Sequence, residues 1–383
     1  MPDLRDAVSL VRIATVVGAR PQFVKAAPVS RALAEAGHEE IVIHTGQHYD
    51  DAMSAAFFRD LEMDEPALNL EVGGGSHGTM TGEMMRRLEP ALNELRPVGV
   101  IVYGDTNSTL AAAVVAAKLS FDDGRRAWLA HVEAGLRSFN RRMPEERNRV
   151  VADHLADLLL APTPAAMANL GREGLAERAE LVGDVMVDAH VWASAQAGSH
   201  LPAPAREHPQ YVLLTLPRAE NVDDPVRFAR ILEGFAIRLP VVFPVHPRTL
   251  KALERTALDL PPNVVPIEPV GYLEMVALEA SAVAIATDSG GVQKEAYLSG
   301  VPCITLRSET EWVETVEAGW NRVVDADPAA LAAALADEIF MRRDRPRPPL
   351  FGDGEAARRI VAALERHHDS ARPAPNLQRR RSE

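Results

Sequence analysis

The chain has 383 residues, of which 47% are hydrophobic and 25% are charged, and its formal net charge is −13. This length favours two domains over one compact core, and the acidic balance argues against a general nucleic-acid-binding protein. No apolar stretch is long enough to span a bilayer, and the N-terminus is too acidic and polar for a secretory signal. The single cysteine, Cys303, excludes an intramolecular disulfide framework and is interpreted as a buried core residue. We therefore expect a cytoplasmic globular protein without a nucleic-acid or membrane partner.

Strand and helix patterns alternate along most of the chain. Helices are predicted at residues 21–35, 51–63 and 350–364, and strands at residues 12–17, 40–45, 98–103, 127–132, 158–161, 179–182, 211–216, 241–245, 264–267, 282–287 and 303–306. This alternation predicts α/β architecture with parallel, doubly wound sheets.

Residues 193–209 are rich in small residues and proline, which is typical of a linker. We therefore expect two doubly wound domains, at residues 1–195 and 210–365, that face each other across a cleft. The basic, proline-containing residues 366–383 are predicted to be a disordered tail.

Three carboxylates stand at the ends of predicted elements. Asp105 follows the strand at 98–103, Glu133 follows the strand at 127–132, and Pro144 places Glu145 at a helix start. Because ligands bind at the carboxyl ends of the strands in open α/β sheets, these groups are candidate acids and bases. A helix-capping role for Asp105 or Thr106 and a solvated position for the two glutamates remain alternatives.

Two strand-to-helix turns are candidate anion sites, since a helix N-terminus offers unpaired N–H groups. The turn in GARPQFVK carries Arg20 and Lys25. The turn in DSGGVQKEA could hold a diphosphate with its serine and glycines and reach ribose hydroxyls with its glutamate, through Ser289, Gly290, Gly291 and Glu295. An ordinary βα turn is the alternative at both places, and the chain has neither a dinucleotide fingerprint nor a P-loop.

The histidines and acids are scattered singly, without metal-ligand spacing. His48 in TGQHYD and His246 in FPVHPR are more typical of loop histidines than of catalysts. We expect neither a metal ion nor a cofactor.

Nine motifs in order resemble the non-hydrolysing UDP-N-acetylglucosamine 2-epimerase family over about residues 12–345. They are GARPQF, TGQHYD, YGDTNSTL, HVEAGLRSF, MPEERNR, VGDVMVD, HPRT, DSGGVQKEA and TEWVETVEAG. The variants GARPQF and HVEAGLRSFN are most similar to a branch that contains UDP-2,3-diacetamido-2,3-dideoxyglucuronate 2-epimerases, whereas the plain GlcNAc enzymes more often have GTRPE. The resemblance implies two Rossmann-like domains in the glycosyltransferase-B arrangement, a UDP-sugar substrate in the cleft, and a homodimer.

The resemblance also implies a reaction and its residues. Loss of UDP from C1 gives oxocarbenium character that makes the hydrogen on C2 removable, and a carboxylate then abstracts it to leave a glycal. Reprotonation from the opposite face with return of UDP inverts C2, so two acid/base groups are needed. By motif match these groups come from Asp105, Glu133 and Glu145. Substrate and UDP contacts are implied for Arg20, Lys25, Gln47, His48, Arg137, Arg218, Asn221, His246, Ser289, Gly290, Gly291 and Glu295.

The chain departs from the family at Pro217, where the motif T-x-H-R-x-E-N has its substrate-contacting histidine. Proline has no ionisable side chain and no N–H, so it cannot donate to a diphosphate. Alternative functions are therefore a hydrolase that releases UDP and free sugar, or a nucleotide-sugar-binding protein with lost or altered activity. A glycosyltransferase is disfavoured by the carboxylate cluster. We expect an epimerase because all three carboxylates are retained.

Overall fold

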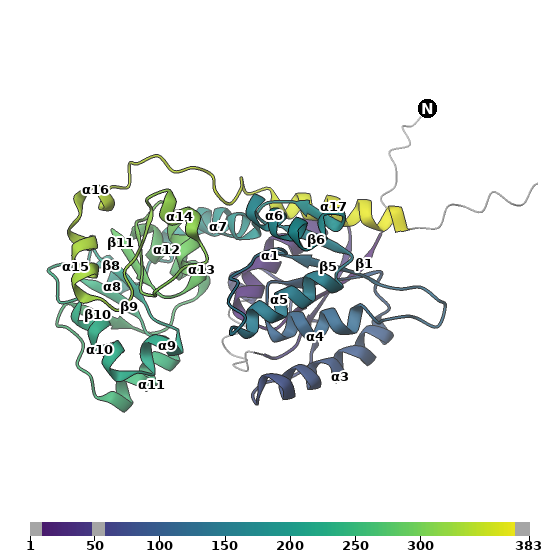
Figure 1. Cartoon of the computed structure of the whole chain (residues 1–383), viewed down its shortest axis with the longest axis horizontal. Helices are drawn as coiled ribbons and strands as arrows, with labels where there is room; N and C mark the ends of the chain where they lie inside the picture. The colour runs from purple at the N-terminus through teal and green to yellow at the C-terminus, as the bar shows by residue number, and fades with distance from the viewer. Residues whose placement is uncertain (1–9, 48–57, 372–383) are drawn as a thin grey trace, which may run out of the picture. The chain divides into compact units, whose positions relative to one another are not determined.

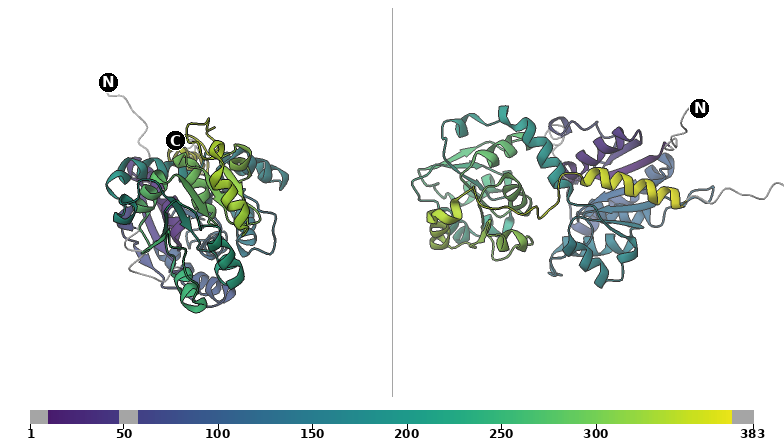
Figure 2. Two further views of the ribbon diagram at one scale, coloured as in Figure 1. Left: turned by 90° about the vertical axis from the view of Figure 1, so that its left-hand side faces the viewer. Right: turned by 90° about the horizontal axis from the view of Figure 1, so that it is seen from above.

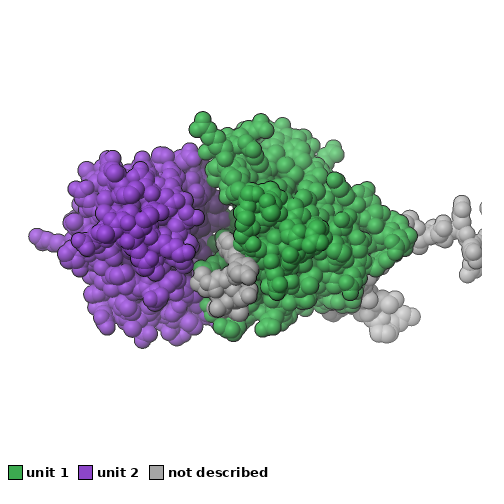
Figure 3. Space-filling view, turned by 90° about the horizontal axis from the view of Figure 1, so that it is seen from below, with its two compact units in different colours: residues 1–188, 351–383 green, residues 189–350 purple. Residues whose placement is uncertain are grey.

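The structure is a computed structural model that describes residues 10–47 and 58–371. The chain divides into two compact units, with residues 1–188 and 351–383 in unit 1 and residues 189–350 in unit 2 (Figure 3). Each unit contains one parallel sheet with helices around it (Figure 1). The expected α/β class with doubly wound parallel sheets is confirmed. No helix in the described ranges is long and apolar enough to cross a membrane.

The sheet of unit 1 has the strand order β3-β2-β1-β4-β5-β6-β7, and all neighbouring strands are parallel. Its strands are β1 (Arg12–Val17), β2 (Glu39–His44), β3 (Leu68–Asn69), β4 (Gly99–Tyr103), β5 (Trp128–Val132), β6 (Leu158–Ala161) and β7 (Ala179–Leu181). Its helices are α1 (Arg20–Glu35), α3 (His77–Leu95), α4 (Asn107–Ala116), α5 (Pro144–Leu155), α6 (Pro164–Arg172), the short η1 (Ala176–Arg178) and α17 (Ala356–Ala371). The central strands are buried on both faces, which explains their continuous apolar sequences.

The sheet of unit 2 has the order β10-β9-β8-β11-β12-β13, again with parallel neighbours. Its strands are β8 (Val212–Thr215), β9 (Val241–Pro244), β10 (Val264–Ile267), β11 (Ala284–Thr287), β12 (Cys303–Thr305) and β13 (Asn321–Val323). Its helices are η2 (Ala197–Ser199), α8 (Ala203–Arg206), α9 (Ala219–Val222), α10 (Pro225–Glu233), α11 (Pro247–Thr256), α12 (Tyr272–Ser281), α13 (Gly290–Ser299), α14 (Val313–Glu317), α15 (Pro328–Ala336) and α16 (Glu338–Met341). Cys303 is buried in β12, as expected.

Both sheets place their first strand in the middle. In unit 1, β1 lies between β2 and β4, and in unit 2, β8 lies between β9 and β11. Strand order reverses at such a point, and ligands of open α/β sheets bind at the carboxyl ends of the strands there. The fold therefore predicts ligand sites at the carboxyl ends of β1, β4 and β5 in unit 1 and of β8 and β11 in unit 2.

The region expected to be a linker is folded instead. Helix α7 (Val185–Gln196) crosses the boundary between the units, and η2 and α8 follow it within residues 193–209. The small residues Ala193, Ala197 and Ala205 are buried, at 0%, 4% and 1% exposure. Small side chains permit close packing here. The composition that predicted a linker therefore belongs to packed helices.

The C-terminal helix α17 belongs to unit 1 and not, as expected, to the second domain. It packs against α1 (Figure 2). His38 Nε2 lies 3.0 Å from Glu365 Oε1. Its apolar face buries Ile360 and Leu364. The helix continues to Ala371, so the first part of the predicted tail is helical; residues 372–383 lie outside the described ranges.

Candidate active site

The turn after β1 is closed by a glutamine of α1. Gln22 Oε1 accepts from the backbone N–H groups of Gly18 and Ala19, at 2.9 and 3.1 Å. Its Nε2 donates to the carbonyl of Tyr103 at the end of β4, at 2.9 Å. Two backbone donors that were expected to serve an anion are therefore already used, and the turn is tied to the neighbouring strand. Arg20, at the start of α1, is half-buried.

Gly18 is required by close approach. A Cβ atom at this position would lie 2.0 Å from Thr45 Oγ1 and 2.2 Å from Ser108 Oγ. Gln47 completes this corner, because its Oε1 accepts from the Ser108 N–H at 3.1 Å and from the Ser108 hydroxyl at 2.8 Å. The ends of β1, β2 and β4 are thus locked together around small side chains.

Glu133 forms an ion pair with Lys25 of α1 at the ends of β5 and β1. Glu133 is only 9% exposed and has a φ of 71°, a left-handed conformation that is rare outside glycine. Burial alone would lower the pKa of Lys25, but the charges of Glu133 and Asp105 outweigh it, so the pKa of Lys25 is raised. Lys25 is therefore a cation fixed beside two of the predicted catalytic carboxylates.

Asp105 is held from α5. The guanidinium of Arg149 pairs with its carboxylate, and Asn148 Nδ2 donates to its main-chain carbonyl at 2.9 Å. The N-cap of α4 is the next residue, Thr106, which accepts from the N–H of Thr109. The capping alternative is therefore confirmed at Thr106 and not at Asp105, whose carboxylate is free of that role.

Glu145 is exposed in the first turn of α5, and the helix begins at Pro144 as predicted. Glu145 and Asp105 line one cavity of about 220 Å³, together with Gln47 and His77. The structure thus brings Asp105 and Glu145 to one concave surface and puts Glu133 with Lys25 at the neighbouring strand end. Two carboxylates have a cation beside them and the third is open to solvent.

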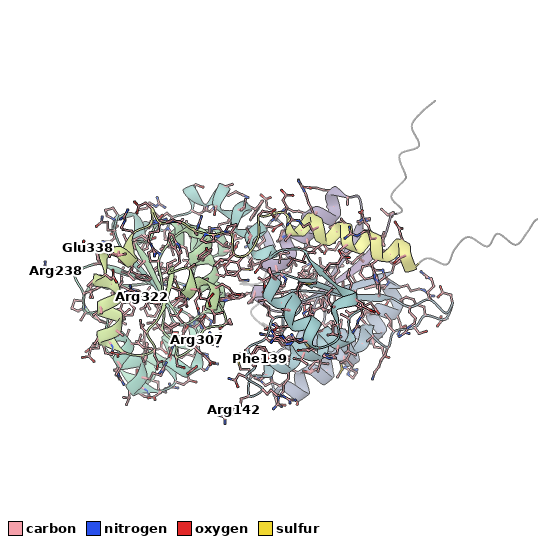
Figure 4. All side chains as sticks on the ribbon, turned by 45° about the horizontal axis from the view of Figure 1, so that its top comes forward. Phe139, Arg142, Arg238, Arg307, Arg322 and Glu338 are labelled. Carbon is pink, nitrogen blue, oxygen red and sulfur yellow. The ribbon has the colours of Figure 1, made fainter. Side chains whose placement is uncertain are left out.

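Arg137 does not reach this cavity. Its side chain is 1% exposed and is clamped between Asp153, at 2.7 Å, and Glu173, at 2.8 Å. The structure therefore gives it an internal ion-pairing role in place of the expected substrate contact. The following loop is anchored by Glu146, which accepts from the N–H groups of residues 138 and 139, and it leaves Phe139 70% exposed at the surface (Figure 4).

The second anion site lies at the start of α13 in unit 2. Ser289 is the N-cap but its side chain makes no capping bond, and a Cβ at Gly290 would lie 2.3 Å from Glu311 Oε1. Glu311 in turn pairs with Arg307 at 2.7 Å and lies 3.8 Å from Arg218 (Figure 4 labels Arg307). A carboxylate thus sits at the helix N-terminus with two arginines around it, as expected where an anion is favoured.

Glu295, on the same helix, is 7% exposed and interacts with Glu279 of α12, which is fully buried. Burial raises the pKa of Glu295 to about 7. Burial and the neighbouring carboxylate raise the pKa of Glu279 well above its ordinary value. Two neighbouring buried carboxylates cannot both be ionised at low cost, so the pair retains a proton over part of the neutral range.

Asn221 is an internal link and not an open ligand group. Its Nδ2 donates at 2.8 Å both to Asp288 and to the carbonyl of Leu306, and its Oδ1 accepts from Arg227 at 2.6 Å. Burial raises the pKa of Asp288 to about 6. Asn221 therefore orders the ends of β8, β11 and β12 from within.

The remaining predicted positions are less informative. His246 is exposed and is the N-cap of α11, where its Nδ1 accepts from the N–H of Arg248 at 3.2 Å. Pro217 is half-buried between β8 and α9. His48 lies outside the described residues. An apolar pocket of about 580 Å³ opens beyond β9 and β10 and is lined by Val245, Leu250, Ile267, Pro269 and Val270 among others.

A family model described as UDP-N-acetylglucosamine 2-epimerase matches residues 31–365. The chain belongs to this family. It is 44% identical to a UDP-2,3-diacetamido-2,3-dideoxy-D-glucuronate 2-epimerase of Pseudomonas aeruginosa, over 92% of this chain and 99% of the relative. It is 45% identical to a UDP-N-acetylglucosamine 2-epimerase homolog of Methanococcus maripaludis, with the same coverage.

Solved structures agree with this assignment. The crystal structure of the Methanocaldococcus jannaschii UDP-GlcNAc 2-epimerase in complex with UDP-GlcNAc and UDP superposes with a TM-score of 0.83, at 42% identity over 92% of this chain and 99% of that one. The calicheamicin glycosyltransferase CalG4 shares only the fold, with a TM-score of 0.58 at 17% identity. The resemblance inferred from the motifs is confirmed.

The sequence did not predict several residues that the structure places at or near these candidate sites. Arg307 and Glu311 lie at the start of α13, Glu279 faces Glu295, and His77 lines the cavity of unit 1. Glu311 is the second residue of the motif TEWVETVEAG, so this motif could have indicated it as a candidate site residue. Glu279 and His77 stand in no motif, and only packing of separate helices reveals them. In the described ranges no group of three or more potential ligands could hold a metal ion.

Proposed function

We propose that the chain is a UDP-sugar 2-epimerase that inverts C2 of a UDP-2-acetamido sugar by eliminating UDP to a glycal and adding it back. The proposal rests on one observation above all. Unit 1 places Asp105 and Glu145 on one small cavity and Glu133 at the adjacent strand end, at the point where the strand order reverses. Such a set supplies the two acid/base groups that abstraction and return of a proton on opposite faces require.

The cations in unit 1 support this chemistry. Lys25 pairs with Glu133 and Arg149 pairs with Asp105, so each of these carboxylates has a positive charge beside it. Glu145 is exposed to solvent in the first turn of α5. The roles proposed are abstraction of the C2 hydrogen by an ion-paired carboxylate and proton delivery from the other face by a second member of the set.

Nucleotide recognition is assigned to unit 2. The diphosphate would bind at the N-terminus of α13, beside Ser289 and the glycines, with Arg218 and Arg307 as cations. Glu295 would accept from ribose hydroxyls. Charge stabilisation of the departing UDP by these donors is the larger energetic contribution to its release.

Two substrates are proposed together, UDP-GlcNAc and a UDP-2,3-diacetamido-glucuronate, because relatives named for each are similarly identical to this chain, at 42% and 44%. The non-hydrolysing outcome, in which UDP returns to the sugar, is part of the proposal. Pro217 favours the second candidate, a nucleotide-sugar-binding protein with lost or altered turnover, because the family's histidine is missing there.

The test is proton NMR on each UDP-sugar in heavy water with the full chain. Reversible elimination exchanges the C2 hydrogen for deuterium and yields the C2 epimer. Glu133→Gln should reduce this exchange by about 10²–10⁴-fold while calorimetry shows unchanged UDP affinity. The matched control is Glu94→Gln, the same change at an exposed residue of α3.

Other outcomes decide against the proposal in distinct ways. Free sugar accumulating with UDP would identify a hydrolase. UDP binding without exchange on either substrate would identify the binding protein. Exchange in Glu133→Gln at the parental rate would remove the catalytic role of that residue.

A further inference from the structure

A buried ionic cluster ties together the three segments that carry the carboxylates. His131 of β5 is fully buried, with its Nδ1 2.7 Å from Asp153 Oδ1 on α5 and its Nε2 2.7 Å from the carbonyl oxygen of Gly104. Gly104 precedes Asp105, His131 lies two residues before Glu133, and Asp153 stands on the helix whose first turn carries Glu145. One histidine–aspartate couple therefore connects all three segments.

The partners of the ring define its charge. The Gly104 oxygen is a carbonyl and can only accept, so Nε2 of His131 must carry a proton. Asp153 Oδ2 already accepts from the Gly135 N–H at 3.1 Å and pairs with Arg137 at 2.7 Å, which favours the ionised carboxylate. An ionised Asp153 can only accept, so Nδ1 of His131 carries a proton as well.

The charges around the ring are balanced. Burial would raise the pKa of Asp153, but the charges and hydrogen bonds of His131 and Arg137 hold it below the ordinary value. Arg137 is in turn neutralised by a bidentate contact with Glu173, at 2.8 Å through both Nε and the second guanidinium nitrogen. Two cations and two anions thus form a compensated chain, which removes the main cost of burying an imidazolium. Charged groups nearby include the pairs Lys25–Glu133 and Arg149–Asp105, Glu146 at 3.4 Å from Arg149, and His154 at 3.8 Å from Glu173.

We propose that His131 is a positioning residue with a proton on each ring nitrogen, whose two N–H groups hold the turn at Gly104 and helix α5 in the geometry that catalysis requires. This inference rests on the proposed epimerase function for its kinetic consequence, but not for the protonation state. The turn is sensitive to position, because a Cβ at Gly104 would lie 3.1 Å from Glu133 Oε2 and 3.2 Å from Lys25 Nζ. Loss of the Nε2 proton would release the turn at Gly104 from β5, and loss of the Nδ1 proton would release α5 from β5.

The protonation state is tested directly by NMR on protein with isotope-labelled histidine. At neutral pH, wild-type protein should show one buried histidine with protons on both ring nitrogens. His131→Gln should remove this signal, and Asp153→Asn should reduce it to a single ring proton. A His131 ring with one proton in the wild type at neutral pH overturns the proposal, whatever the enzyme does.

The positioning role is tested by kinetics. His131→Gln should lower kcat for C2 exchange by about 10–100-fold, since a displacement of about 1 Å is worth that much, with KM changed less than about twofold. The matched control is His154→Gln, on α5 beside Asp153 but 48% exposed, which should keep the parental kcat. If His131 had only a structural role, His131→Gln would lower the amount of folded protein, but kcat and KM of the folded fraction would stay at their parental values.

Two outcomes contradict the positioning role: a parental kcat in folded His131→Gln, or a loss seen in KM alone. If wild-type protein shows no C2 exchange, the proposed function fails, and the positioning role fails with it. The ring-proton spectrum then still decides whether the buried imidazolium exists, so the two failures are distinguishable.

Discussion

The two units treat their buried carboxylates in opposite ways. In unit 1 each buried carboxylate near the site has a cation: Glu133 has Lys25, and Asp153 has His131 and Arg137. In unit 2 Glu295 faces another carboxylate, Glu279, and burial raises the pKa of Glu295 to about 7. Unit 1 therefore pairs these buried carboxylates with cations, whereas the carboxylate pair of unit 2 retains a proton.

This difference fits the tasks proposed for the two units. A base that removes a poorly acidic hydrogen must be ionised at the start, and a cation beside it ensures this. A group that contacts ribose hydroxyls needs only hydrogen bonds, and a shared proton avoids placing a second negative charge near a diphosphate. Consequently, removing one charge should have opposite effects on the stability of the two units.

The largest effect is expected for Lys25→Met. It leaves Glu133 buried without its cation and should lower the free energy of unfolding by about 3–5 kcal/mol. Urea unfolding measures this change, with Lys25→Arg as the charge-preserving control. The double variant Lys25→Met/Glu133→Gln should recover most of the loss. A double variant no more stable than Lys25→Met would show that the ion pair is not the cause.

A smaller and opposite effect is expected for Glu279→Gln. A carboxyl group with a raised folded pKa binds a proton in the folded state that the unfolded state has released, so stability falls as pH rises between the two pKa values. For Glu295 this window runs from 4.5 to about 7, with a slope of up to about 1.4 kcal/mol per pH unit. An amide at position 279 can donate to an ionised Glu295, so the slope should largely disappear.

The measurement is urea unfolding of wild-type protein and Glu279→Gln at pH values across and above that window. Above it the variant should be the more stable protein by about 1–3 kcal/mol, as expected when a buried group gains a partner. Glu274→Gln is a useful control on the same helix, because Glu274 is only half-buried and caps Gly271 at 3.0 Å. Parallel pH profiles for wild-type protein and Glu279→Gln would refute the shared proton.

Arg137→Lys separates internal ion pairing from substrate contact. Lysine cannot form the bidentate contact with Glu173, so the free energy of unfolding should fall by about 1–2 kcal/mol. UDP affinity measured by calorimetry should remain unchanged, because the side chain is enclosed in unit 1. A tenfold loss of UDP affinity in a fully folded variant would restore the contact that the motif implied.

The sequence predicted most strands because buried parallel strands are continuous apolar runs, as in β4 and β5. It missed β3 and β13, which have two and three residues and no such run. It also predicted the carboxylates Asp105, Glu133 and Glu145, because their motifs lie at the end of a strand or the start of a helix. It could not tell that Arg137 pairs inward or that Glu279 meets Glu295, because those partners come from separate elements that only packing brings together.

The smallest effect is expected for Pro217→His, which restores the residue type of the family motif. Pro217 is half-buried between β8 and α9, so stability should change by less than about 0.5 kcal/mol, as for most positions outside the core. We expect C2 exchange to fall, by less than about tenfold. An imidazole placed there without an acceptor is penalised for its unmet polar atoms. A clear rate gain on UDP-GlcNAc would contradict this expectation and would identify a missing donor to the diphosphate as the defect in this chain. If wild-type protein and Pro217→His both bind UDP without C2 exchange, the loss of turnover would instead lie in unit 1, which carries the proposed catalytic carboxylates.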